Sequence, residues 1–164
     1  MILYLVRHGL AVDRTDPKSP PEAERPLTAR GVQKTRAAAL GLRALGIKPD
    51  AVITSPFVRA AQTAEIFAEA IGFPLDKIRV SEALKPAENP ADILKEISHL
   101  KAKEVACFGH APHVDLLIAQ LAGARSPFTV LKKAGVACFE QPSAHSRWDL
   151  LWILTPKMLR ELGG

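Results

Sequence analysis

Short apolar runs alternate with longer amphipathic segments along most of the chain. Three apolar runs stop abruptly at polar residues, as buried parallel strands do where they enter a loop: 2–6, 51–54 and 104–108. Apolar residues at helical spacing predict four helices, over 29–45, 56–71, 90–100 and 114–121. Weaker patterns indicate strands at 78–80, 136–139 and 148–154 and a short helix that begins at Pro156.

The ends of the first two helices carry clear signals. Thr28 is a suitable N-cap for the first helix, and Gly46 marks its end. Ser55 followed by Pro56 predicts the N-cap and the first residue of the second helix. Arg59 then falls in the first turn, where its positive charge opposes the helix dipole. That local conflict suggests an anionic partner.

Strands that alternate with helices predict an α/β fold, a three-layer α/β/α sandwich with a mostly parallel central sheet. The two strands near the end have no helix between them, so one of them can be antiparallel. The length of 164 residues suits one domain, which we place at 1–164. In open sheets of this kind the ligand binds at the carboxyl ends of the strands.

The composition is typical of a soluble globular protein. Apolar residues make up 48% of the chain and charged residues 24%, and no apolar run is long enough to span a bilayer. The first residues lack the basic leader and cleavage site of a signal peptide, so we expect a cytoplasmic protein. Two cysteines, Cys107 and Cys138, lie in apolar strand segments and are expected to be buried, reduced thiols.

The net charge of +5 favours anionic ligands without choosing among them. The basic residues are scattered and aromatic residues are only 5% of the chain, so we expect no nucleic-acid partner and no membrane partner. The segment 13–26 is polar and rich in proline, which predicts a loop that serves as a connector.

Four residues at predicted strand ends are candidates for phosphate chemistry. Arg7, His8 and His110 follow two of the apolar runs, and Arg59 lies just beyond a third. Guanidinium groups bind phosphate oxygens through paired, charge-assisted hydrogen bonds, and a neutral imidazole can attack phosphorus. If these residues converge, they form a pocket for a dianion that needs no metal ion.

The same residues lie in segments that resemble the histidine phosphatase superfamily, also called the phosphoglycerate mutase-like family. The signature is Leu5-Val6-Arg7-His8-Gly9, and three further matches follow in the family's order: Arg25-Pro26-Leu27-Thr28 with Gly31, 54–64, and Phe108-Gly109-His110. Four ordered motifs over three quarters of the chain are far more specific than the first motif alone.

The resemblance implies a role for each matching residue. His8 would be the phosphorylated nucleophile, and Arg7, Arg59 and His110 would form the catalytic phosphate pocket. Arg25 would be an outer phosphate or substrate contact. The family's fold is the three-layer, phosphoglycerate mutase-like sandwich that the strand and helix pattern predicts.

Among the family's branches, the short chain most resembles the compact phosphohistidine phosphatases of the SixA type. That likeness implies a metal-independent phosphatase in signal transduction that needs no cofactor and acts as a monomer on a phosphohistidine-bearing protein. Two alternatives stay open: a small-molecule phosphomonoesterase of the same superfamily, and a non-catalytic phosphate-binding module.

One departure from the family pattern concerns the general acid. Many members carry a Leu-x-Glu element after the third strand, and the matching stretch here is Leu84-Lys85-Pro86. Pro86 would stand where that glutamate is expected. Glu82 and Glu88 flank it, and either could substitute if the loop is shaped differently.

The remaining histidines have no supporting pattern. His113 is three residues from His110, but no cysteine or carboxylate is spaced to complete a zinc site, so we expect a surface residue in the first turn of a helix. His99 and His145 are expected to have no functional role.

Overall fold

A computed structural model describes residues 1–144 and 146–164, which leaves His145 outside the description. Its centre is one six-stranded sheet in the order β3-β2-β4-β1-β5-β6. The strands are β1 (Ile2–Arg7), β2 (Ala51–Thr54), β3 (Arg79–Val80), β4 (Glu104–Gly109), β5 (Val136–Glu140) and β6 (Asp149–Leu154). The helices are α1 (Ala29–Ala44), α2 (Val58–Ile71), α3 (Pro90–Ser98), α4 (His113–Leu121) and α5 (Pro156–Gly163).

The sheet is mostly parallel, as predicted. β1 pairs with β4, and β2 pairs with both β4 and β3, all in parallel, while β5 runs antiparallel to β1 and to β6. The carboxyl ends of β1, β2 and β4 therefore meet at one edge of the sheet. Hydrogen bonds of 3.0 Å from His8 N to Gly109 O and from Ser55 N to Phe108 O continue this alignment past the strand ends.

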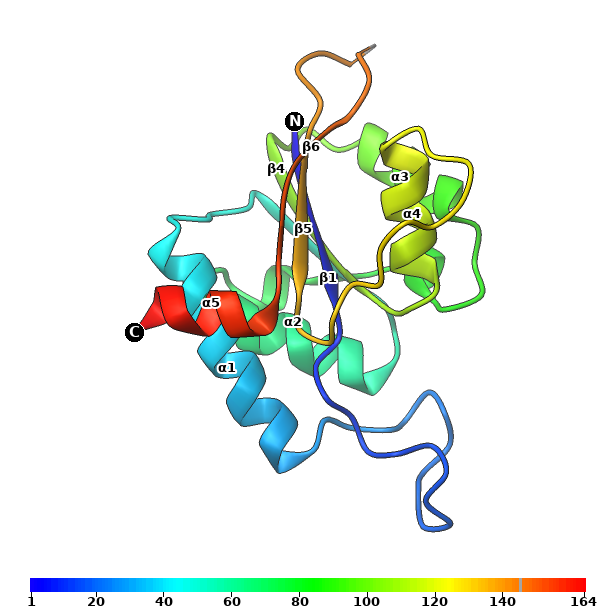
Figure 1. Ribbon diagram of the computed structural model, residues 1–164, viewed down its shortest axis with the longest axis vertical. Helices are drawn as coiled ribbons and strands as arrows, with labels where there is room; N and C mark the ends of the chain where they lie inside the picture. The colour runs from blue at the N-terminus through cyan, green and yellow to red at the C-terminus, as the bar shows by residue number, and fades with distance from the viewer. Residues whose placement is uncertain (145) are drawn as a thin grey trace.

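Helices cover both faces of the sheet, which confirms the three-layer architecture (Figure 1). The side chains of β1 alternate between two hydrophobic clusters, because successive residues of a strand point to opposite faces. Tyr4 and Val6 pack in the cluster that includes α1, α2 and α5, whereas Leu3 and Leu5 pack in the cluster of α3 and α4.

The predicted helix ends are confirmed for α1 and for the end of α2. Thr28 Oγ1 accepts the Gly31 amide at 2.9 Å, and Gly72 closes α2 in the left-handed conformation with a φ of 76°. The predicted start of α2 is wrong, because the helix begins at Val58 and its N-cap is Phe57. The hydroxyl of Ser55 has another partner, described below.

Both cysteines are buried and free, as predicted. In the part of the chain that the structure describes, no helix is both long enough and apolar enough to cross a membrane.

The packing of α2 on β4 generates a stability prediction. Phe67 is fully buried, and its ring centroid lies 5.5 Å from that of Phe108. We expect Phe67→Ala to lower the free energy of unfolding by about 3–5 kcal/mol, since it leaves a cavity in the core. The matched control, Phe128→Ala, removes a ring that is 54% exposed and should change it by about 0.5 kcal/mol or less. Urea denaturation measures both, and a loss below about 1 kcal/mol for Phe67→Ala would contradict this packing.

Candidate active site

A polar cavity of about 660 Å³ opens where the carboxyl ends of the parallel strands meet. The long loop that follows β1 passes beyond this edge of the sheet (Figure 1). The charged residues that line the cavity, together with His8, come from this loop, from the end of β1, from the start of α2 and from the segment before β5: Arg7, His8, Asp13, Arg14, Glu22, Arg25, Arg59 and Lys133.

His8 is held in one tautomer by its own neighbour in the chain. Its Nδ1 lies 2.7 Å from the carbonyl oxygen of Gly9, which only accepts, so Nδ1 carries the hydrogen and donates it. The lone pair is therefore on Nε2. Burial lowers the pKa of His8 to about 3, and the nearby charges of Arg59 and Arg7 act in the same direction. At neutral pH the ring is uncharged and Nε2 can act as a nucleophile.

Gly9 needs to be a glycine at this place. A Cβ atom there would lie 2.2 Å from Thr35 Oγ1, a distance at which the neighbour must move. The Gly9 amide also donates to Thr63 Oγ1 at 2.9 Å, and Thr63 donates to the Arg59 carbonyl at 2.6 Å. These contacts tie the loop after β1 to the first turns of α2.

Arg59 faces His8. Its Nε donates to His8 Nε2 at 3.3 Å, and its side chain is only 3% exposed. Its Nη1 donates to the backbone carbonyl of Glu22 at 2.7 Å, and its Nη2 donates to Glu22 Oε1 at 2.8 Å. Burial lowers the pKa of Arg59 and the Glu22 carboxylate opposes that shift, so the guanidinium stays charged.

Arg7 is oriented from the segment before β5. Its Nη1 donates to the Leu131 carbonyl at 2.8 Å, and the Leu131 amide in turn donates to the buried Asp115 Oδ1 at 2.8 Å. The Nε of Arg7 is buried and has no partner among the described residues.

His110 lies beside His8, with 5.1 Å between the ring centroids. Its Nε2 is 2.8 Å from Ser55 Oγ, and that oxygen already accepts the Phe57 amide at 3.3 Å. A hydroxyl oxygen can donate one hydrogen bond and accept two, so this contact forms with the ring hydrogen on either nitrogen. The Nδ1 of His110 is buried and has no partner within the described part of the chain. His110 is 1% exposed and is not among the described residues that line the cavity.

Burial holds the pKa of His110 well below its ordinary value, and the neighbouring His8 and Arg59 lower it further. His110 is therefore neutral at neutral pH, and the positive charge beside it comes from residues that line the cavity, among them Arg7, Arg59, Arg25 and Lys133.

The structure brings the four principal candidates, Arg7, His8, Arg59 and His110, to one place. Arg25 joins them at the cavity wall, and at 11% side-chain exposure it is not the solvated loop residue that its position suggests. It is oriented by hydrogen bonds to Glu22 and to the Val12 carbonyl.

Glu82 and Glu88 are not brought to the cavity. Both are exposed, and Glu82 pairs with Lys85 on the turn Glu82–Leu84. Pro86 lines the cavity in their place. Within residues 1–144 and 146–164, no group of three His, Cys, Asp or Glu side chains is arranged to hold a metal ion.

Several residues of the site have no signal in the sequence that singles them out. Glu22 and Lys133 lie in irregular segments, and Asp115 resembles an ordinary acidic residue in the first turn of a helix. Ser55 has such a signal, since it lies within the matching stretch 54–64, but its proximity to Pro56 favours the N-cap interpretation.

His113 is a further correction. It is the first residue of α4, as expected, but it is 1% exposed rather than on the surface. Neither ring nitrogen has a hydrogen-bond partner among the described residues. Burial lowers its pKa, so the ring is neutral in the folded protein at neutral pH.

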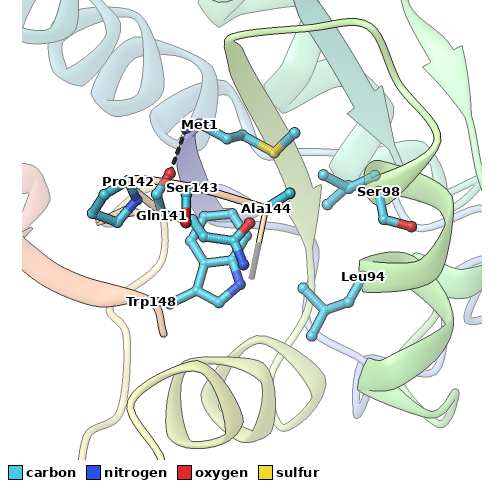
Figure 2. A pocket seen from close by; sticks show the side chains of 9 residues that line it. Met1, Leu94, Ser98, Gln141, Pro142, Ser143, Ala144 and Trp148 are labelled. Carbon is cyan, nitrogen blue, oxygen red and sulfur yellow. Dashed lines mark hydrogen bonds between the residues drawn. The ribbon is translucent and has the colours of Figure 1, made fainter. Parts of the chain in front are cut away.

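A second cavity, of about 420 Å³, lies at the amino end of β1 (Figure 2). The described residues around it include Met1, Leu94 and Trp148, and none is a histidine, an arginine or a carboxylate. Its described lining holds no cationic side chain to bind a phosphate and no base to activate Ser98 or Ser143, so we place the candidate chemistry at the other end of the strand.

Comparisons of sequence and structure relate this chain to known phosphatases. Residues 3–88 match the model of the histidine phosphatase superfamily (branch 1). An uncharacterized protein of Picosynechococcus sp. is 32% identical over 97% of this chain and 99% of its own length. The phosphohistidine phosphatase SixA of Escherichia coli is 28% identical over 92% of this chain and 93% of its own. A solved structure of the protein histidine phosphatase SixA with tungstate superposes with a TM-score of 0.85, at 25% identity, over 96% of this chain and 98% of that one.

The burial of His113 makes stability depend on pH. Its pKa is lowered in the folded protein, so between that value and about 6.5 the unfolded chain binds more protons. The contribution of the neutral His113 ring to the free energy of unfolding is therefore complete above about pH 6.5 and is lost as the pH falls.

We expect His113→Leu to lose less stability than the wild type when the pH is lowered from 8 to 5, because the shift at His113 is removed while those at His8 and His110 stay. Urea denaturation at both pH values measures the difference. The matched control is His99→Leu, which changes an exposed histidine. An equal loss in wild type and His113→Leu would show that His113 does not contribute.

Proposed function

Because the chain belongs to the histidine phosphatase superfamily, we propose that it hydrolyses phosphohistidine on a protein through a phosphoryl group held transiently on His8. The observation that carries this proposal is the fixed tautomer of His8. Its Nδ1 donates to the Gly9 carbonyl, so the lone pair of Nε2 is directed into a pocket that holds Arg7 and Arg59.

The proposed reaction has two displacements at phosphorus. In the first, His8 Nε2 forms a bond to phosphorus while the bond from phosphorus to the substrate nitrogen breaks, and the electron pair leaves with that nitrogen. In the second, a water oxygen forms a bond to phosphorus while the bond from phosphorus to His8 Nε2 breaks, and the electron pair returns to Nε2. The protons of the water stay on inorganic phosphate or pass to solvent, and His8 is again neutral. Arg7, Arg59 and His110 would bind the phosphoryl oxygens in both steps, where charge develops.

We infer that the reaction needs no metal ion. Two guanidinium groups beside the nucleophile, with Arg25 and Lys133 at the cavity wall, supply the positive charge that a divalent cation supplies in other phosphoryl-transfer sites.

The acidic groups of the cavity support a phosphoramidate substrate. Hydrogen bonds from Thr15 lower the pKa of Asp13, and a hydrogen bond from Arg25 lowers the pKa of Glu22, so both are ionised at neutral pH and poorly suited to protonate a leaving group. An alkoxide leaving group gains about two to four orders of magnitude from a general acid. Imidazole gains far less, because its second nitrogen can be protonated beforehand and its pKa is about 6.5.

The relatives support a phosphohistidine substrate carried by a protein. SixA of Escherichia coli is named a phosphohistidine phosphatase and aligns with nearly the whole of this chain, and the superposed solved structure is described as a protein histidine phosphatase. A phosphomonoesterase acting on small esters would use the same nucleophile, and the substrate comparison below separates the two functions.

The covalent step is tested by labelling. Brief incubation with a ³²P-phosphohistidine protein should give an acid-labile label on the wild type and none on His8→Ala. We expect His110→Ala to lower turnover by about two to three orders of magnitude, as the loss of one donor to a developing anion does. A label that persists in His8→Ala would exclude His8 as the nucleophile.

The substrate class is tested by rates. We expect phosphohistidine to be hydrolysed at least about a hundredfold faster than alkyl phosphate esters, since neither carboxylate in the described cavity lining is suited to act as a general acid. Glu82→Gln is the matched control and should leave both rates within about twofold, because Glu82 lies outside the cavity. Equal rates on phosphohistidine and sugar phosphates would favour the phosphomonoesterase.

A further inference from the structure

We propose that Glu22 is the resident counter-ion of the phosphoryl site, and that a bound phosphate displaces its carboxylate from Arg59. Glu22 would thereby limit the affinity of the site for inorganic phosphate and favour release of the product. The role of Glu22 in product release rests on the proposed function. The competition between Glu22 and phosphate for Arg59 does not, because it is a property of anion binding.

The carboxylate of Glu22 is shared between two arginines. Its Oε1 accepts from Arg25 Nη2 at 2.7 Å and from Arg59 Nη2 at 2.8 Å, and its Oε2 accepts from Arg25 Nε at 2.9 Å. Arg25 is thus bound side-on by both oxygens, whereas Arg59 is bound by one. The contact to Arg59 can be given up while the contact through Oε2 to Arg25 stays.

The contact to Arg59 lies on the edge that a phosphoryl group needs. In a planar guanidinium the Nε hydrogen and one Nη2 hydrogen point from the same edge. In Arg59 this edge meets His8 through Nε and Glu22 through Nη2. A phosphoryl group bonded to His8 Nε2 lies against this edge, so its oxygens and Glu22 Oε1 compete for the same donors.

Charge and exposure decide which partner moves. The hydrogen bond from Arg25 and the charges of both arginines lower the pKa of Glu22, so it carries its negative charge at neutral pH and repels a phosphate dianion. The side chain of Glu22 is 52% exposed, whereas that of Arg59 is 3% exposed. The carboxylate can therefore withdraw toward solvent, and the buried arginine cannot.

A purely supporting role for Glu22 makes the opposite prediction. If the carboxylate only holds Arg25 and Arg59 in place, its loss frees two guanidinium groups and weakens phosphate binding. If it competes with phosphate, its loss strengthens binding. The sign of the change therefore separates the two roles.

The test measures the dissociation constant of inorganic phosphate by titration calorimetry, at one pH and one salt concentration. We expect Glu22→Gln, which keeps the shape and removes the charge, to bind phosphate about tenfold more tightly than the wild type, as removal of one repulsive charge near the surface allows. Glu22→Ala should also bind more tightly. Phosphate should inhibit both variants at correspondingly lower concentrations in the phosphohistidine assay.

The matched control is Glu24→Gln, which makes the same charge change on the same loop at an exposed residue outside the cavity lining. It should change the dissociation constant by less than about twofold, because a charge in water is screened. A dissociation constant for phosphate that is unchanged or higher in Glu22→Gln, or higher in Glu22→Ala, than in the wild type overturns the proposal. Calorimetry needs no turnover, so an absence of phosphohistidine hydrolysis would refute the proposed function and leave this test intact.

Discussion

The parallel pairing of β1 with β4 is the interaction on which the site depends. Its register places Arg7 opposite Gly109, and the hydrogen bond from His8 N to Gly109 O extends the pairing by one residue. Two histidines that are far apart in the sequence are brought together in this way, with ring centroids 5.1 Å apart. A parallel sheet orients all its carboxyl ends alike, so the neighbouring β2 adds Ser55 and the start of α2 adds Arg59 at the same edge.

Much of the fold could be predicted from the sequence, because burial imposes a period on each strand and helix. The six strands and five helices lie within a few residues of their predicted positions. The start of α2 was predicted wrongly because a serine before a proline usually acts as an N-cap, whereas here its hydroxyl binds His110. That contact joins two segments that are far apart in the sequence, so the residues around Ser55 alone do not predict it.

The residues at the centre of the candidate site could be predicted from the sequence, and of the charged residues at its wall only Arg25. Arg7, His8, Arg59 and His110 follow strand ends, so their convergence follows from the topology. Glu22 comes from an irregular proline-rich loop whose return to the sheet is set by tertiary contacts, such as the hydrogen bond of 2.9 Å from Val58 N to Ala23 O. The expectation of a mere connector therefore fails, because this loop supplies charged groups to the cavity.

The anchoring of Arg7 links the candidate site to β5. The carbonyl that orients its guanidinium belongs to Leu131, in the segment that leads into β5. A chain in which β5 has not docked beside β1 would hold His8 without this orientation of Arg7. The docking of β5 is therefore a condition for the complete site, although β5 contributes no residue to the cavity lining that the structure describes.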